Sequence, residues 1–540
     1  MLNWPSRLAV IAAALLLLGL TVPFLAKNAL DREVSRDEHQ FISPGALLVR
    51  QHLLPYKDYP YFQAPYQVAL QALVYDFSDK LLESARLLTM VFGLGCLGLI
   101  FAAALRYLSG LPFLIRLATA TALPLFMASN TLFLYTSGRS WNHDLSVFLA
   151  LSAFLVHGRA LARPRPGPGL MASGLLLGLA AGVRLSWVPA VLPFLLAIYW
   201  LGTPPGQARS WRQGLPFLGG MALAALPWLA LFLCAPADTF FGAVVYPGKL
   251  TTDYWASHNY AKAMDWDSKL AFFYQHVFLG AGDYHRFGTY QQNMVIFLAT
   301  AGLALPINLL ALRRGIPQRR ETIFLLLLLP VVWLGSALPT PNMYQYYYQL
   351  IPFCFLALAL AVANLSHLLT RPWPRRAWLT AVALVAAYCL VFGASSCYSV
   401  KWSDLAGRGA WSAARTHVLG QEMARQVGQG KVLTLAPTFP LEGGLDIYPE
   451  LASGPFAFRV AHLLTPEERR ARRMLAPADL EAFLAGQPPA AILTGVDPDL
   501  EPSLLTYAQA HGYRPRPLNH PQMVLWLPNP QTQPSPRDRP

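Results

Sequence analysis

Long apolar stretches constrain this chain more than any other feature of its sequence. They recur in about eleven blocks, each near the length of about 20 residues that a helix needs to cross hydrocarbon. A backbone exposed to lipid must pair its polar groups internally, so these blocks are expected to be helices. Only 13% of the 540 residues are charged, against about 25% in soluble proteins. The expected spans are residues 8–26, 87–106, 112–135, 145–161, 170–183, 186–201, 214–234, 293–312, 321–339, 345–366 and 376–397.

Basic residues lie mainly in the short segments between these blocks. The formal net charge is +14, but no single basic face is formed, and nucleic acid is not an expected partner. Arginine-rich loops usually remain in the cytoplasm, and with the N-terminus inside, every such loop falls on that side. The pattern holds only if the chain breaks at Arg184 into two short spans. The arginines concerned are Arg106, Arg116, Arg159, Arg163, Arg165, Arg209, Arg212, Arg313, Arg314, Arg319, Arg320, Arg371, Arg375 and Arg376.

This topology divides the chain into a membrane domain and an outer domain. Residues 1–397 form the membrane domain, with large outer loops at 27–86 and 235–292. Residues 398–528 are expected to form a soluble periplasmic α/β domain, and residues 529–540 a disordered tail. Its expected elements are a helix near 404–428, a strand at 431–436, a helix capped by Thr465 and Glu468, a helix after Pro477, and strands near 490–494 and 523–527.

The first outer loop contains the most informative motif. Two adjacent acids, Asp37 and Glu38, follow the first span, and an amphipathic segment leads from them to the turn Pro55-Tyr56-Lys57-Asp58. A second amphipathic segment follows, which reads as an interfacial helix. Taken alone, the acid pair is typical of an ordinary solvated loop.

A second acidic position lies in the short outer loop Ser137-Gly-Arg139-Ser-Trp-Asn-His143-Asp144. Asp144 directly precedes a span, so it has two interpretations of equal weight. It is either a functional acid or a helix N-cap, whose carboxylate accepts backbone amides. Both roles are compatible with each other.

Two further positions suggest function near the same membrane face. Arg184 lies between short apolar segments, where a cation either meets an anion or extends to the interface, and a guanidinium suits a phosphate bidentately. The cluster Tyr344-Gln-Tyr346-Tyr-Tyr348 precedes a span and is more typical of an interfacial aromatic belt than of a site.

In their order along the chain and in the membrane face expected for them, these motifs resemble those of the GT-C superfamily of membrane glycosyltransferases. The resemblance is strongest to the branch with protein O-mannosyltransferases and the aminoarabinose transferase of lipid A. The resemblance covers about residues 8–370. It departs from the family pattern at His52, where the turn has Gly, and at Ala64, where some relatives have a basic residue. It implies a polytopic GT-C-type fold and transfer of a sugar from a polyprenyl phosphate at the outer face of a bacterial inner membrane.

The resemblance also implies roles for individual residues. Asp37 is expected to act as general base, with Glu38 and Asp144 orienting the acceptor or holding the base. Substrate-binding roles are implied for Arg184, Arg139, His143, Tyr56, Asp58 and Tyr346. The acceptor is a lipid, a glycan or a protein, and membrane lipids surround the chain.

Three further questions are left open by the sequence. No metal is chemically required, although a divalent ion between Asp37 and Asp144 is an alternative. A transporter or flippase of lipid-linked saccharides is the alternative function. The loop 235–292 carries residues suited to sugar recognition, namely Asp253, Trp255, His258, Asp265, Trp266, Asp283 and His285.

The topology predicts that the segment after Ser403 lies outside the cytoplasm. A reporter enzyme that is active only in the periplasm, fused after Ser403, is expected to be active in intact cells. The same reporter fused in the Arg-rich loop near Arg314 should be inactive and serves as the matched control. Activity of the second fusion and not of the first would reverse the orientation.

Overall fold

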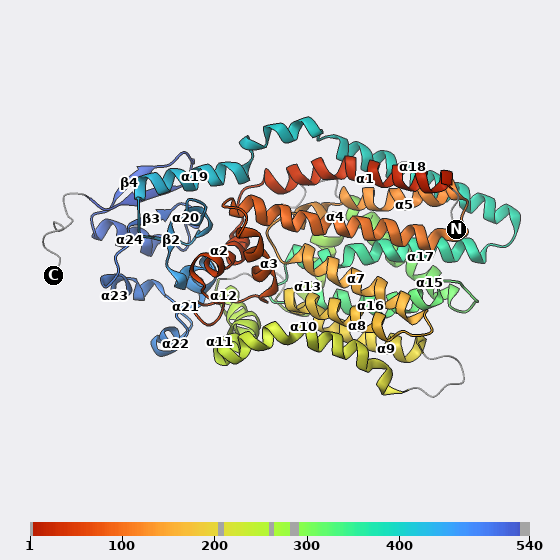
Figure 1. Cartoon of the computed structure of the whole chain (residues 1–540), viewed down its shortest axis with the longest axis horizontal. Coiled ribbons are helices and arrows are strands. Elements are labelled where there is room, and N and C mark those ends of the chain that lie inside the picture. The colour runs from red at the N-terminus through yellow and green to blue at the C-terminus, as the bar shows by residue number, and fades with distance from the viewer. Residues whose placement is uncertain (1–3, 203–209, 259–263, 281–290, 530–540) are drawn as a thin grey trace.

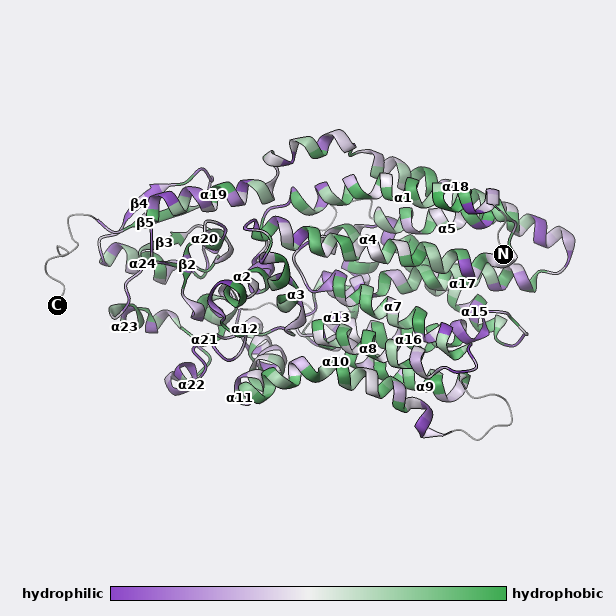
Figure 2. Ribbon diagram, in the orientation of Figure 1, coloured by the Kyte–Doolittle hydropathy of each residue, from purple (hydrophilic) through white to green (hydrophobic). Residues whose placement is uncertain are grey.

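The computed structural model describes residues 4–202, 210–258, 264–280 and 291–529. Long helices run side by side in a bundle, and a C-terminal α/β domain lies at one end of it, opposite the N-terminus (Figure 1). Apolar residues follow the bundle helices, while the C-terminal domain and the connecting loops are more hydrophilic (Figure 2). The predicted fold class is confirmed.

The described residues include eight helices that are long and apolar enough to cross a membrane, and three shorter apolar helices. Together they match the predicted spans. Pro and π-helical turns interrupt several of them, as is common in membrane helices. The bundle helices are α1 Trp4–Leu30, α4 Leu81–Tyr107, α5 Phe113–Ala128, α7 His143–Leu161, α8 Gly167–Val183, α9 Val191–Leu201, α10 Leu215–Cys234, α14 Gln291–Leu298 with its continuation α15 Leu305–Ala311, α16 Arg319–Ala337, α17 Ile351–Leu368 and α18 Pro372–Tyr398.

The predicted break at Arg184 is confirmed. Helix α8 ends at Val183, and Arg184 itself is extended, with φ −152° and ψ 116°. A 3-10 turn, Leu185–Ala190, follows and contains Pro189, which lacks the N–H that a continuous helix would use. Helix α9 then returns toward the end of the bundle at which α8 begins (Figure 1).

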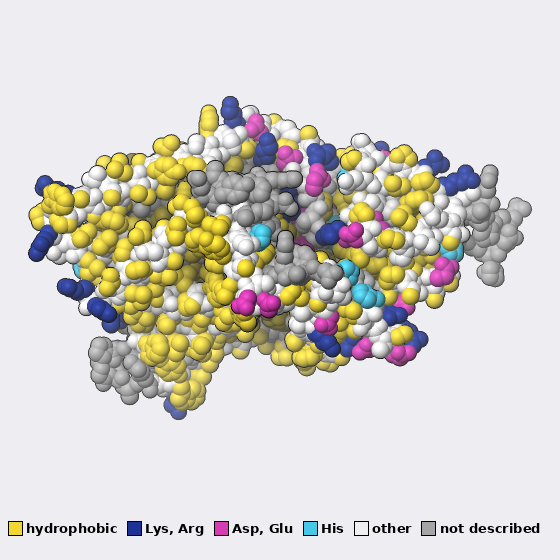
Figure 3. Space-filling view, turned by 180° about the vertical axis from the view of Figure 1, so that it is seen from behind, with side chains coloured by type: hydrophobic (Ala, Val, Ile, Leu, Met, Phe, Trp, Pro, Cys, Tyr) yellow, Lys and Arg dark blue, Asp and Glu magenta, His cyan; other side chains and the backbone are white. Residues whose placement is uncertain are grey.

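The arginine-rich loops lie at the end of the bundle remote from the C-terminal domain, where Figure 3 shows Lys and Arg side chains beyond a broad apolar surface. Two contacts tie these loops together. Arg106 pairs with Glu321 at 2.7 Å, and Arg320 donates to the carbonyl oxygen of Leu161 at 2.7 Å. The separation of basic loops from the C-terminal domain matches the predicted pattern, and the orientation in the membrane stays a prediction.

The first outer loop folds into two short helices at the end of the bundle next to the C-terminal domain, α2 Arg36–Gln51 and α3 Tyr66–Tyr75. At ten residues, α3 is too short to cross hydrocarbon, as predicted. Between them, His52 has φ 56° and Tyr56 has φ 66°. This left-handed backbone favours glycine, so His52 adopts at some cost in strain a conformation that glycine adopts freely.

Smaller helices fill the remaining connections. They are α6 Thr131–Thr136, α11 Pro236–Phe240, α12 Thr251–Ser257 and α13 Trp266–Phe272, with π-helical segments at Phe241–Leu250 and Phe273–Phe278.

The C-terminal domain contains a five-stranded sheet in the order β2-β1-β3-β5-β4. Strands β2, β1 and β3 are parallel, while β5 pairs antiparallel with β3 and β4. The strands are β1 Lys431–Leu433, β2 Asp446–Ile447, β3 Ala491–Thr494, β4 Arg514–Pro517 and β5 Val524–Leu527. The helices are α19 Ser412–Val427, α20 Thr438–Glu442, α21 Pro455–Ala461, α22 Pro466–Ala471, α23 Leu480–Ala485 and α24 Pro502–Ala510.

Most predicted elements of this domain are confirmed, with one correction, while two strands and the helices α20, α21 and α24 were not predicted. The helix near 404–428 is divided at the extended residue Trp411 into a 3-10 segment and α19. Strand β2 was missed because it has two residues. Strand β4 was missed because it reads Arg-Pro-Arg-Pro, and proline is tolerated only at a sheet edge, where β4 lies. The predicted tail falls largely outside the described residues.

Helices α8 and α10 approach each other closely through glycine. A Cβ added at Gly220 would lie 2.0 Å from the carbonyl oxygen of Met171 and 2.7 Å from the amide nitrogen of Leu175. Both atoms are backbone and cannot move aside without separating the helices. Small residues of this kind allow close packing of membrane helices.

We expect Gly220→Ala to lower the thermal unfolding midpoint of the purified protein. The neighbouring Gly219→Ala is the matched control, because a Cβ there meets nothing within 4 Å. Overpacking typically costs about 1–3 kcal/mol, whereas Ala in an open helical position is favourable. Equal midpoints for the two variants would contradict the close approach.

Candidate functional site

A cavity of about 310 Å³ lies where the bundle meets the C-terminal domain. Its walls come from segments far apart in the sequence. Of the predicted site residues, the structure brings Asp37, His143, Arg184 and Tyr346 to this wall. Glu38, Arg139, Asp144, Tyr56 and Asp58 do not line it.

The two adjacent acids face different surroundings. Successive residues of a helix are turned by about 100°, and in the first turn of α2 the side chain of Asp37 lines the cavity while Glu38 is fully buried. No described residue hydrogen-bonds the Asp37 carboxylate. Burial raises its pKa above the ordinary 3.8, although the charges of Arg459 and Arg139 oppose the shift.

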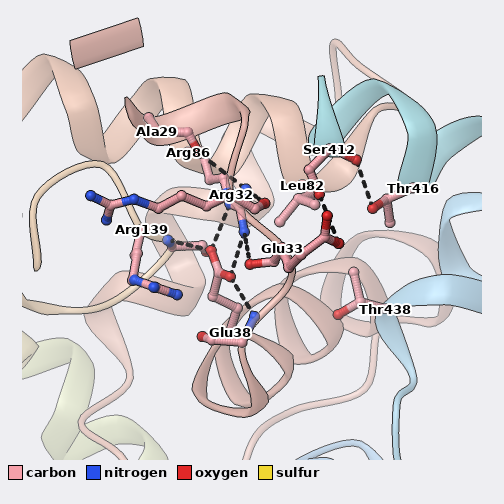
Figure 4. Close-up of polar contacts among 12 residues, drawn as sticks. Ala29, Arg32, Glu33, Glu38, Leu82, Arg86, Arg139, Ser412, Thr416 and Thr438 are labelled. Carbon is pink, nitrogen blue, oxygen red and sulfur yellow. Dashed lines mark hydrogen bonds and ion pairs between the residues drawn. The ribbon is translucent and has the colours of Figure 1, made fainter. Parts of the chain in front are cut away.

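Glu38 is held from several sides (Figure 4). Arg86 of α4 donates to it bidentately, from Nε at 2.8 Å and from Nη2 at 2.7 Å. The backbone amides of Ser35 and Ser140 donate to it, each at 2.9 Å. Burial alone would raise the pKa of Glu38, but Arg86, Arg139 and the amide of Ser35 together outweigh burial and hold the pKa at about 2.

The network of Glu38 occupies its lone pairs, so this carboxylate cannot also orient an acceptor in the cavity. It ties together α2, α4 and the loop before α7. Arg139 lies beside it, with its guanidinium carbon 4.9 Å from the ring centroid of Trp141. Trp141 lines the cavity, so Arg139 supports the wall from behind.

Asp144 is also buried behind the wall. The interpretation of Asp144 as the N-cap of α7 is wrong, because Asn142 is the N-cap and Asp144 is the second helical residue. Its carboxylate accepts from the amide of Gly138 at 2.8 Å and from the hydroxyl of Tyr348. It therefore joins the loop before α7 to the segment before α17.

Arg184 enters the cavity from the break between α8 and α9. Its Nη1 donates to Oδ1 of Asn142 at 3.1 Å and contacts Nε2 of His143 at 3.0 Å. A guanidinium only donates, so Nε2 of His143 must accept and its ring proton must lie on Nδ1. Among the described residues, none accepts from Nη2 and no acid pairs with Arg184.

The tyrosine cluster divides between core and cavity. Tyr344, Tyr347 and Tyr348 are buried in the bundle, so the interpretation as an aromatic belt is wrong for them. Tyr346 faces the cavity, and the guanidinium carbon of Arg184 lies 4.8 Å from its ring centroid.

Tyr56 and Asp58 shape the turn that carries the wall rather than the wall itself. Asp58 accepts from the amide of Leu54 at 2.7 Å. The buried Tyr56 donates to the carbonyl oxygen of Gln63, and Gln63 lines the cavity. Tyr56 and Asp58 therefore position residues of the cavity wall and do not themselves line the cavity.

The alternative of a metal between Asp37 and Asp144 finds no support in the geometry, because only Asp37 reaches the cavity. Within the described ranges, no group of three or more His, Cys, Asp or Glu side chains is placed to hold a metal ion.

Several wall residues were missed from sequence. Arg459 and Phe456 come from α21 of the C-terminal domain, and Tyr246 comes from the loop 235–292. Of the residues suggested in that loop for sugar recognition, Asp283 and His285 fall outside the described residues, and the other five do not line the cavity. No sequence signal joins Arg459 to Asp37, since only the docking of the domain brings them together.

A second hollow of about 340 Å³ adjoins the cavity. It lies against α10 and the segment after it, and Thr239 is its one residue with a polar side chain among apolar neighbours such as Trp228, Leu229 and Phe232. Leu185 and Ala243 line both hollows. The wall of a cavity that contains a cation therefore meets the wall of an apolar groove at these two residues.

Comparisons with known proteins place the fold. No family model and no curated protein matches the sequence. Two solved structures of ArnT from Cupriavidus metallidurans, one bound to undecaprenyl phosphate and one in the apo state, have TM-scores of 0.58 at 13% and 14% identity, and each alignment covers 96% of this chain and 97% of that chain. An oligosaccharyltransferase from Archaeoglobus fulgidus has a TM-score of 0.51 at 12% identity and covers 92% of this chain and 70% of its own. The overall fold is thus similar to that of these two transferases, as the resemblance implied.

Replacing Glu38 with Gln is expected to destabilise the fold. It leaves Arg86 buried without its counter-charge, which typically costs about 3–5 kcal/mol. The pKa of Glu38 is lower in the fold than the ordinary 4.5, so its contribution is present above that value and lost as pH falls toward about 2.

The matched control is Glu33→Gln, five residues earlier, where an exposed pair with Arg415 is worth about 0–1 kcal/mol. Thermal unfolding of both purified variants at neutral pH measures the difference. Equal midpoints would show that the Glu38 network does not hold the site together.

Proposed function

We propose, from the GT-C-type fold, that this chain is a glycosyltransferase that transfers a sugar from a polyprenyl phosphate to an acceptor at the membrane surface. The observation that carries the proposal is the junction of the polar cavity with the apolar groove at Leu185 and Ala243. A substrate that fits both must be amphiphilic, with an anionic or polar head and a long apolar tail. A lipid-linked sugar has this composition.

Arg184 is the residue that suits the phosphate of the donor. It lies beside Leu185, at the junction, and its Nη2 has no acceptor among the described residues. Asn142, His143 and Ser186 fix the rest of the guanidinium. A cation fixed before substrate arrives stabilises charge that develops on a leaving phosphate without further reorganisation.

Asp37 is the residue that suits general base catalysis. Its carboxylate takes the proton from an acceptor hydroxyl while that oxygen bonds to the anomeric carbon of the sugar. The bond from this carbon to the phosphate oxygen breaks, and its electron pair leaves with the polyprenyl phosphate. A raised pKa makes a carboxylate a stronger base, which favours proton transfer near neutral pH.

The remaining wall suits a sugar. Gln40, Gln63 and Gln345 offer amides to hydroxyl groups, and Phe62 and Tyr246 offer aromatic surfaces, stacked with ring centroids 3.8 Å apart. These features do not distinguish hexose from pentose.

The proposed location is a bacterial inner membrane, with a cytoplasmic N-terminus and a periplasmic C-terminal domain. The distribution of arginine supports this orientation. Under it, the cavity opens on the outer side, where the donor is lipid-linked rather than nucleotide-linked.

Asp37→Asn is expected to lower the rate of transfer by about a hundredfold to ten-thousandfold, because it keeps the shape of the side chain and removes the base. Purified protein with a defined polyprenyl phosphate sugar and acceptor provides the assay. Asp31→Asn, an exposed acid in the same loop, is the control and should retain the normal rate. Normal transfer by the Asp37 variant would remove it as the base.

The pH profile of the unmodified protein gives an independent check. The base acts when deprotonated, so kcat/KM should fall as pH drops through its pKa. Burial raises that pKa above 3.8, and the acidic limb is therefore expected above the ordinary value for aspartate.

Replacement of Arg184 tests the phosphate contact. Arg184→Lys keeps the charge but loses the bidentate geometry, so part of the activity should remain, whereas Arg184→Glu should abolish it with folding intact. Binding of undecaprenyl phosphate to each purified variant reports the same loss. Arg212→Glu, at an exposed position in an arginine-rich loop, is the control. Unchanged binding by the Glu variant at 184 would assign Arg184 to the membrane interface alone.

A further inference from the structure

The C-terminal domain contributes a cation to the cavity wall. Arg459 projects from α21, and its guanidinium carbon lies 4.5 Å from the ring centroid of Phe456 and 5.4 Å from those of Tyr254 and Trp255. Its Nη2 donates to the hydroxyl of Tyr246 at 3.3 Å. Aromatic faces from two separate segments of the chain thus hold this guanidinium in place.

Among the described residues, no acid forms an ion pair with Arg459. Within the part of the chain that the structure describes, no Asp or Glu lies at ion-pair distance from it, and its buried Nε has no hydrogen-bond acceptor. Other arginines of the same domain differ, since Arg469 pairs with Asp479 at 2.7 Å and Arg472 with Asp238 at 3.4 Å. An arginine that is stacked, partly buried and unpaired is arranged to receive an anion from outside the chain.

The position of Arg459 places that anion beside the proposed base. Asp37 feels the charge of Arg459 more than that of any other arginine. Arg184, by contrast, lies at the junction with the apolar groove. The cavity therefore has two cationic positions, one toward the lipid and one toward the C-terminal domain.

We propose that Arg459 binds an anionic group, a carboxylate or a phosphate ester, on the substrate that occupies the cavity beside Asp37. This rests on the proposed function, in which Arg184 is engaged by the donor phosphate. Arg459 then sets specificity by favouring acceptors that carry a negative charge. The C-terminal domain is accordingly part of the substrate-binding site.

The test uses purified full-length protein in lipid nanodiscs, saturated with undecaprenyl phosphate. Three soluble probes are compared by ligand-observed NMR: methyl glucuronide, glucose 6-phosphate and the uncharged methyl glucoside. At least one charged probe is expected to have a Kd at least about tenfold lower than that of methyl glucoside. This ratio is typical of the gain in affinity from a hydrogen bond to a charged group. The tighter of the two charged probes identifies the anion as carboxylate or phosphate.

Arg459→Gln is expected to abolish this preference, and Arg459→Lys to restore part of it. Arg470→Gln, at an exposed position of the same domain, should leave it unchanged. Retained binding of undecaprenyl phosphate by Arg459→Gln shows that the variant is folded. Equal binding of charged and uncharged probes to the unmodified protein, or an unchanged preference in Arg459→Gln, would overturn the proposal.

The two proposals fail separately in this experiment. If undecaprenyl phosphate does not bind the unmodified protein, the assignment of the donor is wrong, and the anion site is then judged from the probes alone.

Discussion

The buried ion pair between Glu38 and Arg86 is the interaction on which the site depends. Both side chains are fully buried, so each charge is tolerable only because the other is present and the remaining hydrogen-bonding positions are filled. Arg86 also donates to the carbonyl oxygens of Ala29, Arg32 and Glu33. One guanidinium thereby fixes where the chain leaves the first span, and one carboxylate fixes the loop before α7. With both held, Asp37 has a defined position on the cavity wall.

Around this anchor, the wall residues are supported by partners that never reach the cavity. Asp144 and Tyr348 hold the loop that presents Asn142 and His143, and those two residues hold Arg184. Tyr56 holds the backbone of Gln63. The polar surface of the cavity is therefore preorganised through a layer of buried hydrogen bonds, as a site must be if its charges are to act without rearrangement.

The sequence was sufficient for the membrane part of the fold because one physical rule governs it. A helix must have a given length to cross the hydrocarbon of a membrane, and arginine-rich loops indicate which ends of the helices lie on the same side. The spans and the break at Arg184 were therefore predictable. The motif singled out Asp37, and the structure places it on the cavity wall. Glu38 and Asp144 were expected to orient the acceptor or hold the base, and only packing shows that both are buried behind the cavity wall. Arg459 and Tyr246 were not predictable, since their relation to Asp37 depends on tertiary contacts between segments hundreds of residues apart.

The distance along the chain between the walls of the cavity has a consequence for biosynthesis. Asp37 leaves the ribosome before Phe456 and Arg459, which follow it by about 420 residues. Domains generally form in the order of synthesis, so the bundle can assemble around an open half-cavity. The cavity is completed only when the C-terminal domain has folded and docked on the bundle. A chain arrested before α21 would thus hold Asp37 and the apolar groove and lack the part of the cavity wall that Phe456 and Arg459 supply.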